Sequence, residues 1–166
     1  MATDGFEEVE LTGPMDRLKK EGFTVHLVAE RKRLKSWNKG VWGEEFQADL
    51  QINELDPAEY DALIIPGGVI NADRLRRNKD AVEKIRKFDR DRKLIAAICH
   101  GPQLLIEADL VKGKNMTSHP AVSTDMKNAG AEYKEEGVVS TSHYVTAQGP
   151  KDIEAFNESI LKKLGK

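Results

Sequence analysis

The sequence predicts an α/β domain built on a mainly parallel sheet, because short apolar runs alternate with stretches of helical spacing. The two clearest runs, residues 62–65 and 94–98, are apolar throughout, as expected of strands that are buried on both faces of a parallel sheet. The chain has 166 residues and no repeat, low-complexity tract or linker. We therefore expect residues 1–166 to form one domain with its own core.

The elements expected in the first half of the chain follow from hydrophobic spacing and turn residues. Residues 9–21 have helical spacing and precede Gly22, and Pro14 predicts a kink or a late helix start. The positions expected to point inward are Val9, Leu11, Met15 and Leu18. Residues 24–29 are expected to form a strand, and residues 41–55 an exposed antiparallel excursion.

The second half continues the alternation of strands and helices. Helical spacing predicts helices over residues 80–91 and 103–110 and a last helix that starts at Pro150. Short strands are expected around residues 115–118, 131–133, 137–141 and 144–147.

The start of the chain departs from this scheme. A parallel α/β domain would usually begin with a full buried strand, whereas this chain opens Met1-Ala2-Thr3-Asp4-Gly5-Phe6 and is polar almost at once. We therefore expect the first strand to be truncated, with at most a stub of it present.

Composition and charge exclude several function classes. The formal net charge is -2 and 33% of residues are charged, with no long block of one sign, which argues against nucleic-acid binding. The basic stretch at residues 31–35 is short and is expected to be a solvated loop. No apolar run approaches a membrane span and no signal peptide is visible. A single cysteine forms no intrachain disulfide, so a cytoplasmic location is expected.

That cysteine, Cys99, occupies the most informative position in the chain. It ends the apolar run 94–98, and His100-Gly101-Pro102 predicts a sharp turn into the next helix. A tight turn between strand and helix lifts a nucleophile clear of the sheet. The positive end of the helix would also favour a thiolate. The alternative is a small buried apolar residue; the setting favours a reactive thiol.

Two further segments should meet Cys99 at the carboxyl edge of the sheet, where ligands bind in such folds. Pro66-Gly67-Gly68 ends the preceding strand, and its glycines would let backbone N–H groups approach a developing oxyanion. An acidic segment follows the expected first strand, and a protonated carboxyl there could hydrogen-bond the thiolate and shuttle a proton. The sequence alone leaves Glu7, Glu8 and Glu10 open for that role.

The remaining polar candidates are weaker. His100 could act as a base, although its place beside Cys99 on a turn leaves the angle open. The other histidines (His26, His119 and His143) are expected to be structural or exposed. Asp73 is expected to cap a helix, with contact to the site or to a neighbouring subunit as the alternative. The histidines and the cysteine show no metal-ligand spacing, so no metal is expected.

Three stretches of the chain together resemble the ThiJ/PfpI superfamily, and specifically its PfpI-type intracellular-protease and stress-protein branch. They are Asp4-Gly5-Phe6-Glu7-Glu8-Val9-Glu10, Ile65-Pro66-Gly67-Gly68 and Ala97-Ile98-Cys99-His100-Gly101-Pro102-Gln103-Leu104-Leu105. Residues 125–132 and 150–152 are also similar to that branch, so the resemblance covers nearly the whole chain. It implies a flavodoxin-like three-layer sandwich, with helices on both faces of the central sheet, that assembles into homodimers or larger homo-oligomers.

The resemblance also implies roles for individual residues. Cys99 would be the nucleophile and Glu7 the carboxyl that hydrogen-bonds its sulfur. His100 matches the histidine of the protease-type site, and Asp73 the acidic residue that a neighbouring subunit supplies to it. Backbone N–H groups of Gly68 and His100, beside Gly67, would form an oxyanion hole.

The preferred functional hypothesis is a cysteine-dependent enzyme that acts on reactive 2-oxoaldehydes or early glycation adducts, without glutathione, metal or organic cofactor. The substrate would be a small aldehyde or a glycated protein. One alternative is an intracellular cysteine peptidase, and another is a redox-sensing or chaperone-like stress protein in which Cys99 is oxidised reversibly.

Overall fold

Four strands form the central sheet in the order β10-β11-β7-β6. In the computed structural model, which describes all 166 residues, these strands are β6 (Ala62–Ile65), β7 (Leu94–Ile98), β10 (Val138–Thr141) and β11 (Tyr144–Ala147). β6, β7 and β11 are mutually parallel, and β10 closes one edge as the antiparallel partner of β11. All five residues of β7 are buried, which explains why that strand is a continuous apolar run.

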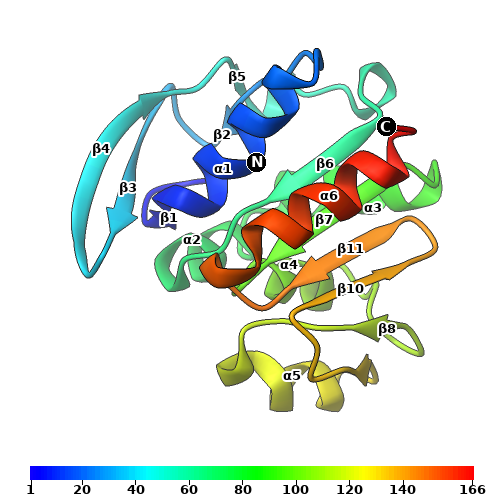
Figure 1. The fold of residues 1–166 in the computed structure, drawn as a ribbon. Coiled ribbons are helices and arrows are strands. Elements are labelled where there is room, and N and C mark those ends of the chain that lie inside the picture. The colour runs from blue at the N-terminus through cyan, green and yellow to red at the C-terminus, as the bar shows by residue number, and fades with distance from the viewer.

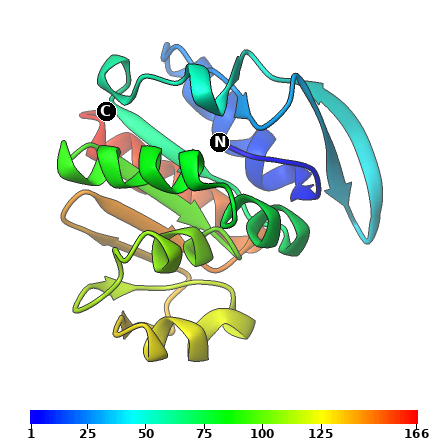
Figure 2. The ribbon, with the colours of Figure 1, turned by 180° about the vertical axis from the view of Figure 1, so that it is seen from behind.

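Helices cover both faces of this sheet (Figures 1 and 2). α1 (Glu8–Lys20) and α6 (Ile153–Lys163) pack together on one face. α2 (Val69–Leu75), α3 (Lys79–Arg90) and α4 (Pro102–Glu107) lie on the other. The predicted α/β fold, with helices on both faces of a mainly parallel sheet, is therefore confirmed.

Short strands extend the fold around this centre. β1 (Phe6–Glu7) pairs in parallel with β3 (Arg33–Asn38), which forms a hairpin with β4 (Val41–Gln47). This hairpin projects from one side of the molecule (Figure 1). The other parallel pairs are β2 (Val28–Ala29) with β5 (Leu50–Gln51), and β8 (Asn115–Met116) with β9 (Glu132–Tyr133). α5 (Ser123–Asn128) and 3₁₀ turns at Ile52–Glu54, Pro57–Glu59, Pro120–Val122 and Pro150–Asp152 complete the chain.

Several expectations for the first half of the chain were wrong. The basic stretch 31–35 is not only a loop, because β3 begins at Arg33 and pairs on both sides. Only residues 28–29 of the expected strand 24–29 are paired, and residues 24–27 have no strand partner. Val9 is 44% exposed rather than inward. α1 continues through Pro14 without a late start.

The later elements match the expectations more closely. β6, β7 and β11 have the predicted bounds, and α3 is displaced by one residue. α4 is shorter than expected because it ends at Glu107, and a 3₁₀ turn at Pro150 precedes α6. The sequence analysis missed α2 and α5 altogether. No helix has both the length and the apolar character needed to cross a membrane.

Candidate active site

Cys99 lies at the predicted elbow between β7 and α4. Its φ angle is +62°, a left-handed conformation that is rare for residues other than glycine. Two backbone hydrogen bonds hold it there: its N–H donates to Ala147 O (2.9 Å), and its carbonyl accepts from His119 N (2.8 Å). Gly101 permits the turn, because a Cβ at this position would lie 2.7 Å from Ile65 O. The strain is therefore fixed by the surrounding fold.

Gly67 and Gly68 lie beside Cys99 at the same edge of the sheet, as predicted. A Cβ on Gly67 would lie 2.6 Å from the Cβ of Cys99, so only glycine allows this approach. Gly68 has a φ of +92°, and a Cβ there would lie 2.3 Å from Gly5 O. The backbone N–H groups of Gly68 and His100 act to lower the pKa of the Cys99 thiol, against the larger effect of burial.

The carboxyl beside the thiol belongs to Glu10, not to Glu7. Glu10 is completely buried, and its Oε2 accepts a hydrogen bond from Gly67 N (2.8 Å). Its Oε1 has no hydrogen-bond partner, and the carboxyl and the Cys99 thiol influence each other's pKa. The expected hydrogen bond from Glu7 to the sulfur is absent, because Glu7 belongs to β1 and its backbone N–H donates to Gly67 O (3.2 Å).

Helix periodicity explains why Glu10, and not Glu7, lies beside the thiol. Glu10 lies in the first turn of α1, on the same helix face as the buried Pro14 and Leu18, four and eight residues further on. Glu8 faces the β3–β4 hairpin instead, where it accepts hydrogen bonds from Ser36 Oγ (2.5 Å) and Asn38 Nδ2 (3.0 Å). The spacing of Glu10 from Pro14 and Leu18 is the sequence signal that could have selected it.

Burial controls the ionisation of the thiol and the carboxyl. Burial raises the pKa of Glu10 to about 7, although the hydrogen bond from Gly67 and the thiol partly offset this effect. Burial also raises the pKa of Cys99, and the negative charge of Glu10 raises it further. A helix terminus was expected to lower the thiol pKa, but desolvation dominates here. The ionisation of the thiol is therefore linked to the charge of Glu10.

Two histidines line the pocket that contains the sulfur. His100 Nδ1 is 3.2 Å from Cys99 Sγ. The orientation of the His100 ring, which could not be predicted from the sequence, therefore permits contact with the sulfur. The ring of His100 stacks on His119, with centroids 4.7 Å apart. Burial, and then His119, lower the pKa of His100 and favour its neutral form. His119 was expected to be structural or exposed. It reaches the site because its backbone N–H donates to the carbonyl of Cys99, a contact that sequence patterns did not predict.

A pocket of about 410 Å³ opens above these groups. Its lining residues are Gly5, Glu7, Glu10, Trp37, Gly68, Val69, Ile70, Cys99, His100, His119 and Pro150. Glu7 therefore faces the cavity without holding the sulfur, and burial raises its pKa. Trp37, which the sequence left unexplained, lines the pocket from β3 and packs edge-to-face on Trp42 (5.5 Å between centroids).

Asp73 lies apart from the pocket. It is an exposed residue within α2 rather than a helix cap, and it does not line the cavity. A contribution from Asp73 to the site of a second subunit stays a prediction. No group of three or more His, Cys, Asp or Glu side chains is arranged to hold a metal ion.

Comparison with known proteins places this site in a family. A profile of the DJ-1/PfpI family matches residues 1–163. The chain belongs to the DJ-1/PfpI family. Protein/nucleic acid deglycase 2 of Escherichia coli is 42% identical over 167 residues, which cover 99% of this chain and 95% of that protein. YraA of Bacillus subtilis, provisionally named a cysteine protease, is 39% identical over 164 residues, with 99% and 95% coverage.

Solved DJ-1/PfpI structures agree with the fold. A two-domain protein of Anabaena variabilis, with DJ-1/ThiJ/PfpI-like and ferritin-like domains, superimposes with a TM-score of 0.91 at 39% identity. The match covers 98% of this chain and 46% of that one. DJ-1 of Schizosaccharomyces pombe has a TM-score of 0.85 at 24% identity, over 99% and 90% of the two chains, which shows a shared fold. Several homologues are named deglycases, so an enzyme of this family is the supported class.

Proposed function

We propose that the chain is a cysteine-dependent enzyme that removes reactive 2-oxoaldehydes or their early adducts on proteins, with Cys99 as nucleophile and Glu10 as proton shuttle. The observation that carries this proposal is a wholly buried carboxyl, with a pKa raised to about 7, beside the only thiol of the chain. A group with a pKa near the working pH both accepts and donates protons efficiently.

The size of the cavity supports a small carbonyl substrate. About 410 Å³ is near the lower end of the range for small-molecule sites, which extends from roughly 300 to 1,000 Å³. Trp37 and Ile70 supply apolar lining, and Glu7 lines the same cavity. A short aldehyde, or one modified side chain reaching in from a protein surface, suits this space.

The chemistry balances with these groups and water. The sulfur of Cys99 adds to the aldehyde carbon while the thiol proton passes to Glu10, and the carbonyl oxygen then takes that proton to give a hemithioacetal. Glu10 next removes the proton from the same carbon, and the proton of the hemithioacetal hydroxyl passes to the neighbouring ketone oxygen. Glu10 then returns its proton to the adjacent carbon, which leaves a thioester of a hydroxy acid. Water cleaves the thioester, releasing the acid and the thiol. The N–H groups of Gly68 and His100 would stabilise negative charge beside the sulfur.

Peptide hydrolysis is the second candidate, and the contact between His100 Nδ1 and Cys99 Sγ (3.2 Å) favours it. A cysteine–histidine pair is the usual arrangement for nucleophilic attack on an amide. However, the charge of a protonated His100 is disfavoured by burial and by His119. A thiolate–imidazolium pair is therefore less well supported here than proton transfer to Glu10.

The first test measures methylglyoxal consumption and lactate formation without glutathione. We expect Cys99→Ser and Glu10→Gln to abolish lactate formation, because each removes a group that the reaction consumes and regenerates. Glu7→Gln is the matched control, since it alters a carboxyl in the same pocket that does not interact with the sulfur. Loss of activity in Glu7→Gln but not in Glu10→Gln would reverse the assignment.

A second experiment separates adduct repair from scavenging of free aldehyde. The hemithioacetal of methylglyoxal with N-acetylcysteine releases aldehyde spontaneously, at a rate measured with a chemical trap. Adduct loss that saturates at this rate as enzyme is added indicates scavenging, whereas loss that exceeds it indicates direct attack on the adduct. A folded wild type that forms no lactate, but cleaves casein or oxidises reversibly at Cys99, would instead support the peptidase or the redox-sensor alternative.

Self-association stays a prediction. Val41, Trp42 and Val69 are large apolar side chains that are 64%, 46% and 61% exposed, and Val69 also lines the pocket. A second copy that covered them would bury apolar surface beside the site. Sedimentation velocity tests this expectation, and Asp73→Asn tests whether a neighbour's carboxylate affects turnover.

A further inference from the structure

Asn71 is a polar side chain in the interior of the molecule. It belongs to α2 and is completely buried. A buried amide is costly unless its donors and its acceptor find partners. All of them do so here: Nδ2 donates to Pro66 O (3.0 Å) and Gly67 O (3.1 Å), and Oδ1 accepts from Thr3 N (2.7 Å). The side chain therefore links the loop that follows β6, residues 66–68, to the segment that precedes β1.

The position of Asn71 near the start of α2 explains this reach. Side chains of an α-helix tilt toward its N-terminus, and α2 begins at Val69. A short side chain two residues into the helix therefore reaches back to the carbonyl groups of the loop. Asparagine suits this place because its amide carries two N–H donors and an acceptor on one short arm.

The two carbonyl groups that Asn71 binds belong to peptide units that face the reactive pair. A trans peptide unit is planar, and its C=O and N–H groups point in opposite directions. The unit with the carbonyl of Pro66 carries the N–H of Gly67, which donates to Glu10 Oε2 (2.8 Å). The next unit has the carbonyl of Gly67 and the N–H of Gly68, and that N–H acts to lower the pKa of the Cys99 thiol. Holding each oxygen therefore fixes the direction of the N–H group opposite to it.

The loop needs such an anchor because its two glycines leave the backbone free to turn. A larger residue could not stiffen it, since a Cβ on Gly67 would lie 2.5 Å from Glu10 Oε2. Gly67 O also accepts from Glu7 N (3.2 Å), whereas Pro66 O has no hydrogen bond other than the one from Asn71. The peptide unit that donates to Glu10 thus depends on Asn71 for its orientation.

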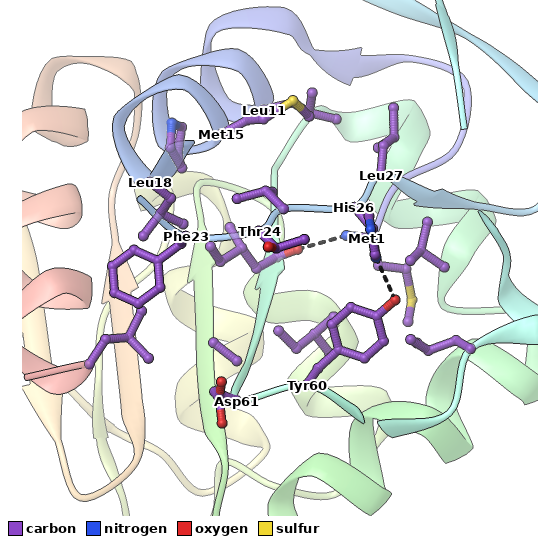
Figure 3. Close-up of a pocket in the computed structure, with 18 of the residues that line it drawn as sticks. Met1, Leu11, Met15, Leu18, Phe23, Thr24, His26, Leu27, Tyr60 and Asp61 are labelled. Atoms are coloured by element: carbon purple, nitrogen blue, oxygen red, sulfur yellow. Dashed lines mark hydrogen bonds between the residues drawn. The ribbon is translucent and has the colours of Figure 1, made fainter. Parts of the chain in front are cut away.

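Asn71 lies where it cannot contact a substrate. It does not line the pocket above Cys99, although its neighbours Val69 and Ile70 do. It also does not line the separate cavity of about 460 Å³ that Figure 3 shows, which is walled by residues such as Phe23 and Tyr60. Any effect of Asn71 on the chemistry of Cys99 must therefore pass through the backbone of residues 66–68.

We propose that Asn71 is a positioning residue for the Cys99–Glu10 pair, because it orients the N–H groups of the loop toward the carboxyl and the sulfur. Loss of its donors would let both peptide units turn and would weaken the hydrogen bond from Gly67 to Glu10. That hydrogen bond lowers the pKa of Glu10, so its loss should raise this pKa further above about 7. The expected effect on turnover rests on the proposed function, whereas the effect on the pKa of Glu10 does not.

The test titrates Glu10 directly by NMR, from the side-chain carboxyl ¹³C resonances of protein labelled at its glutamates, with Glu10→Gln to assign the signal. We expect Glu10 of the wild type to titrate near pH 7, and that of Asn71→Ala about one pH unit higher. This shift follows because a hydrogen bond to a charged group is worth about one to two pKa units. Asn71→Ser, whose hydroxyl can donate to one carbonyl, should titrate between the two. The other titratable groups that act on Glu10, Glu7 and Cys99, are unchanged in these variants.

Asn78→Ala is the matched control. Asn78 caps α3 by accepting a hydrogen bond from Ala81 N (3.0 Å), and it does not contact residues 66–68. Loss of this cap should lower Tm without moving the titration of Glu10. With methylglyoxal as substrate, we expect Asn71→Ala to lower kcat at least about tenfold and to leave KM within about twofold, because the donors are misplaced while the pocket lining is intact.

The titration decides the proposal even if turnover is absent. A folded Asn71→Ala whose Glu10 titrates at the wild-type pH overturns it. An equal shift in Asn78→Ala also overturns it, since that shift would reflect general loosening. If Asn71→Ala does not fold, the same titration of Asn71→Ser decides. A wild type that forms no lactate refutes the proposed function alone, whereas an unchanged kcat in an active Asn71→Ala refutes the role of Asn71 in turnover.

Discussion

Glu10→Gln should stabilise the chain at alkaline pH while it abolishes the proposed activity. Glu10 is completely buried, so its ionised form loses the solvation it has in the unfolded chain. Glutamine has nearly the same shape, and its side-chain oxygen can still accept the hydrogen bond from Gly67 N. The substitution therefore removes the ionisation with little change in packing.

The magnitude follows from the pKa of Glu10, which is about 7 in the folded chain against an ordinary value of 4.5. Between these values the folded chain holds a proton that the unfolded chain has lost. The stability of the wild type therefore falls as pH rises from 4.5 to 7. At about 1.36 kcal/mol per pKa unit, the whole effect is about 3 kcal/mol. The advantage of Glu10→Gln over wild type should grow by this amount between pH 4 and pH 8.

Urea unfolding of both proteins at pH 4, 5, 6, 7 and 8 measures this difference directly. Groups that titrate alike in both proteins cancel in the subtraction, and pH 8 stays below the ordinary pKa of the thiol. Glu154→Gln is the control, because it makes the same substitution on the surface, at a side chain that is 82% exposed. A flat difference for Glu10→Gln would show that Glu10 ionises normally and would remove the basis of its proposed role.

Three further outcomes follow from the same structure. If the Glu10 carboxylate is the base, kcat/KM for methylglyoxal should level off above about pH 7 and fall about tenfold per unit below it, and a profile without an inflection near pH 7 would contradict this. Gly68→Ala should lower both Tm and turnover, because φ is +92° and the added Cβ would lie 2.3 Å from Gly5 O; a normal Tm would show that the loop relaxes without cost. Phe156→Ala should reduce the free energy of unfolding by about 3–5 kcal/mol in urea titrations, since this α6 side chain is completely buried, whereas a loss below about 1 kcal/mol would indicate that the core refills.

The central part of the fold could be predicted because its signals are local. β6 and β7 are apolar runs bounded by turn residues, and burial on both faces requires that composition. The elbow at Cys99 could also be predicted from a local signal, because a buried strand is followed directly by a turn that contains Gly101 and Pro102. Once two neighbouring parallel strands are placed, Gly67 and Cys99 must lie at the same edge.

The parts that were missed depend on contacts between distant residues. β3 is a strand because Leu34 and Ser36 are buried between β1 and β4, although the charged residues around them suggest a solvated loop. Residues 24–26 have strand composition but their backbone groups make no hydrogen bond, so composition alone could not reveal their state. His119 reaches the site because its N–H binds Cys99 O, 20 residues earlier in the chain.

The role beside Cys99 falls to Glu10 rather than to Glu7. Assigning such a role therefore requires the register of the helix as well as the position of the residue in the motif. Both carboxyls occur within four residues, and both line the pocket. Glu7 ends β1, where its backbone N–H is committed to Gly67 O, whereas Glu10 begins the buried face of α1. Only the helical position carries a carboxyl into the interior, and only a buried carboxyl acquires a pKa of about 7. The change from strand to helix between Glu7 and Glu8 thus separates a carboxyl that only lines the pocket from the one suited to exchange a proton with Cys99.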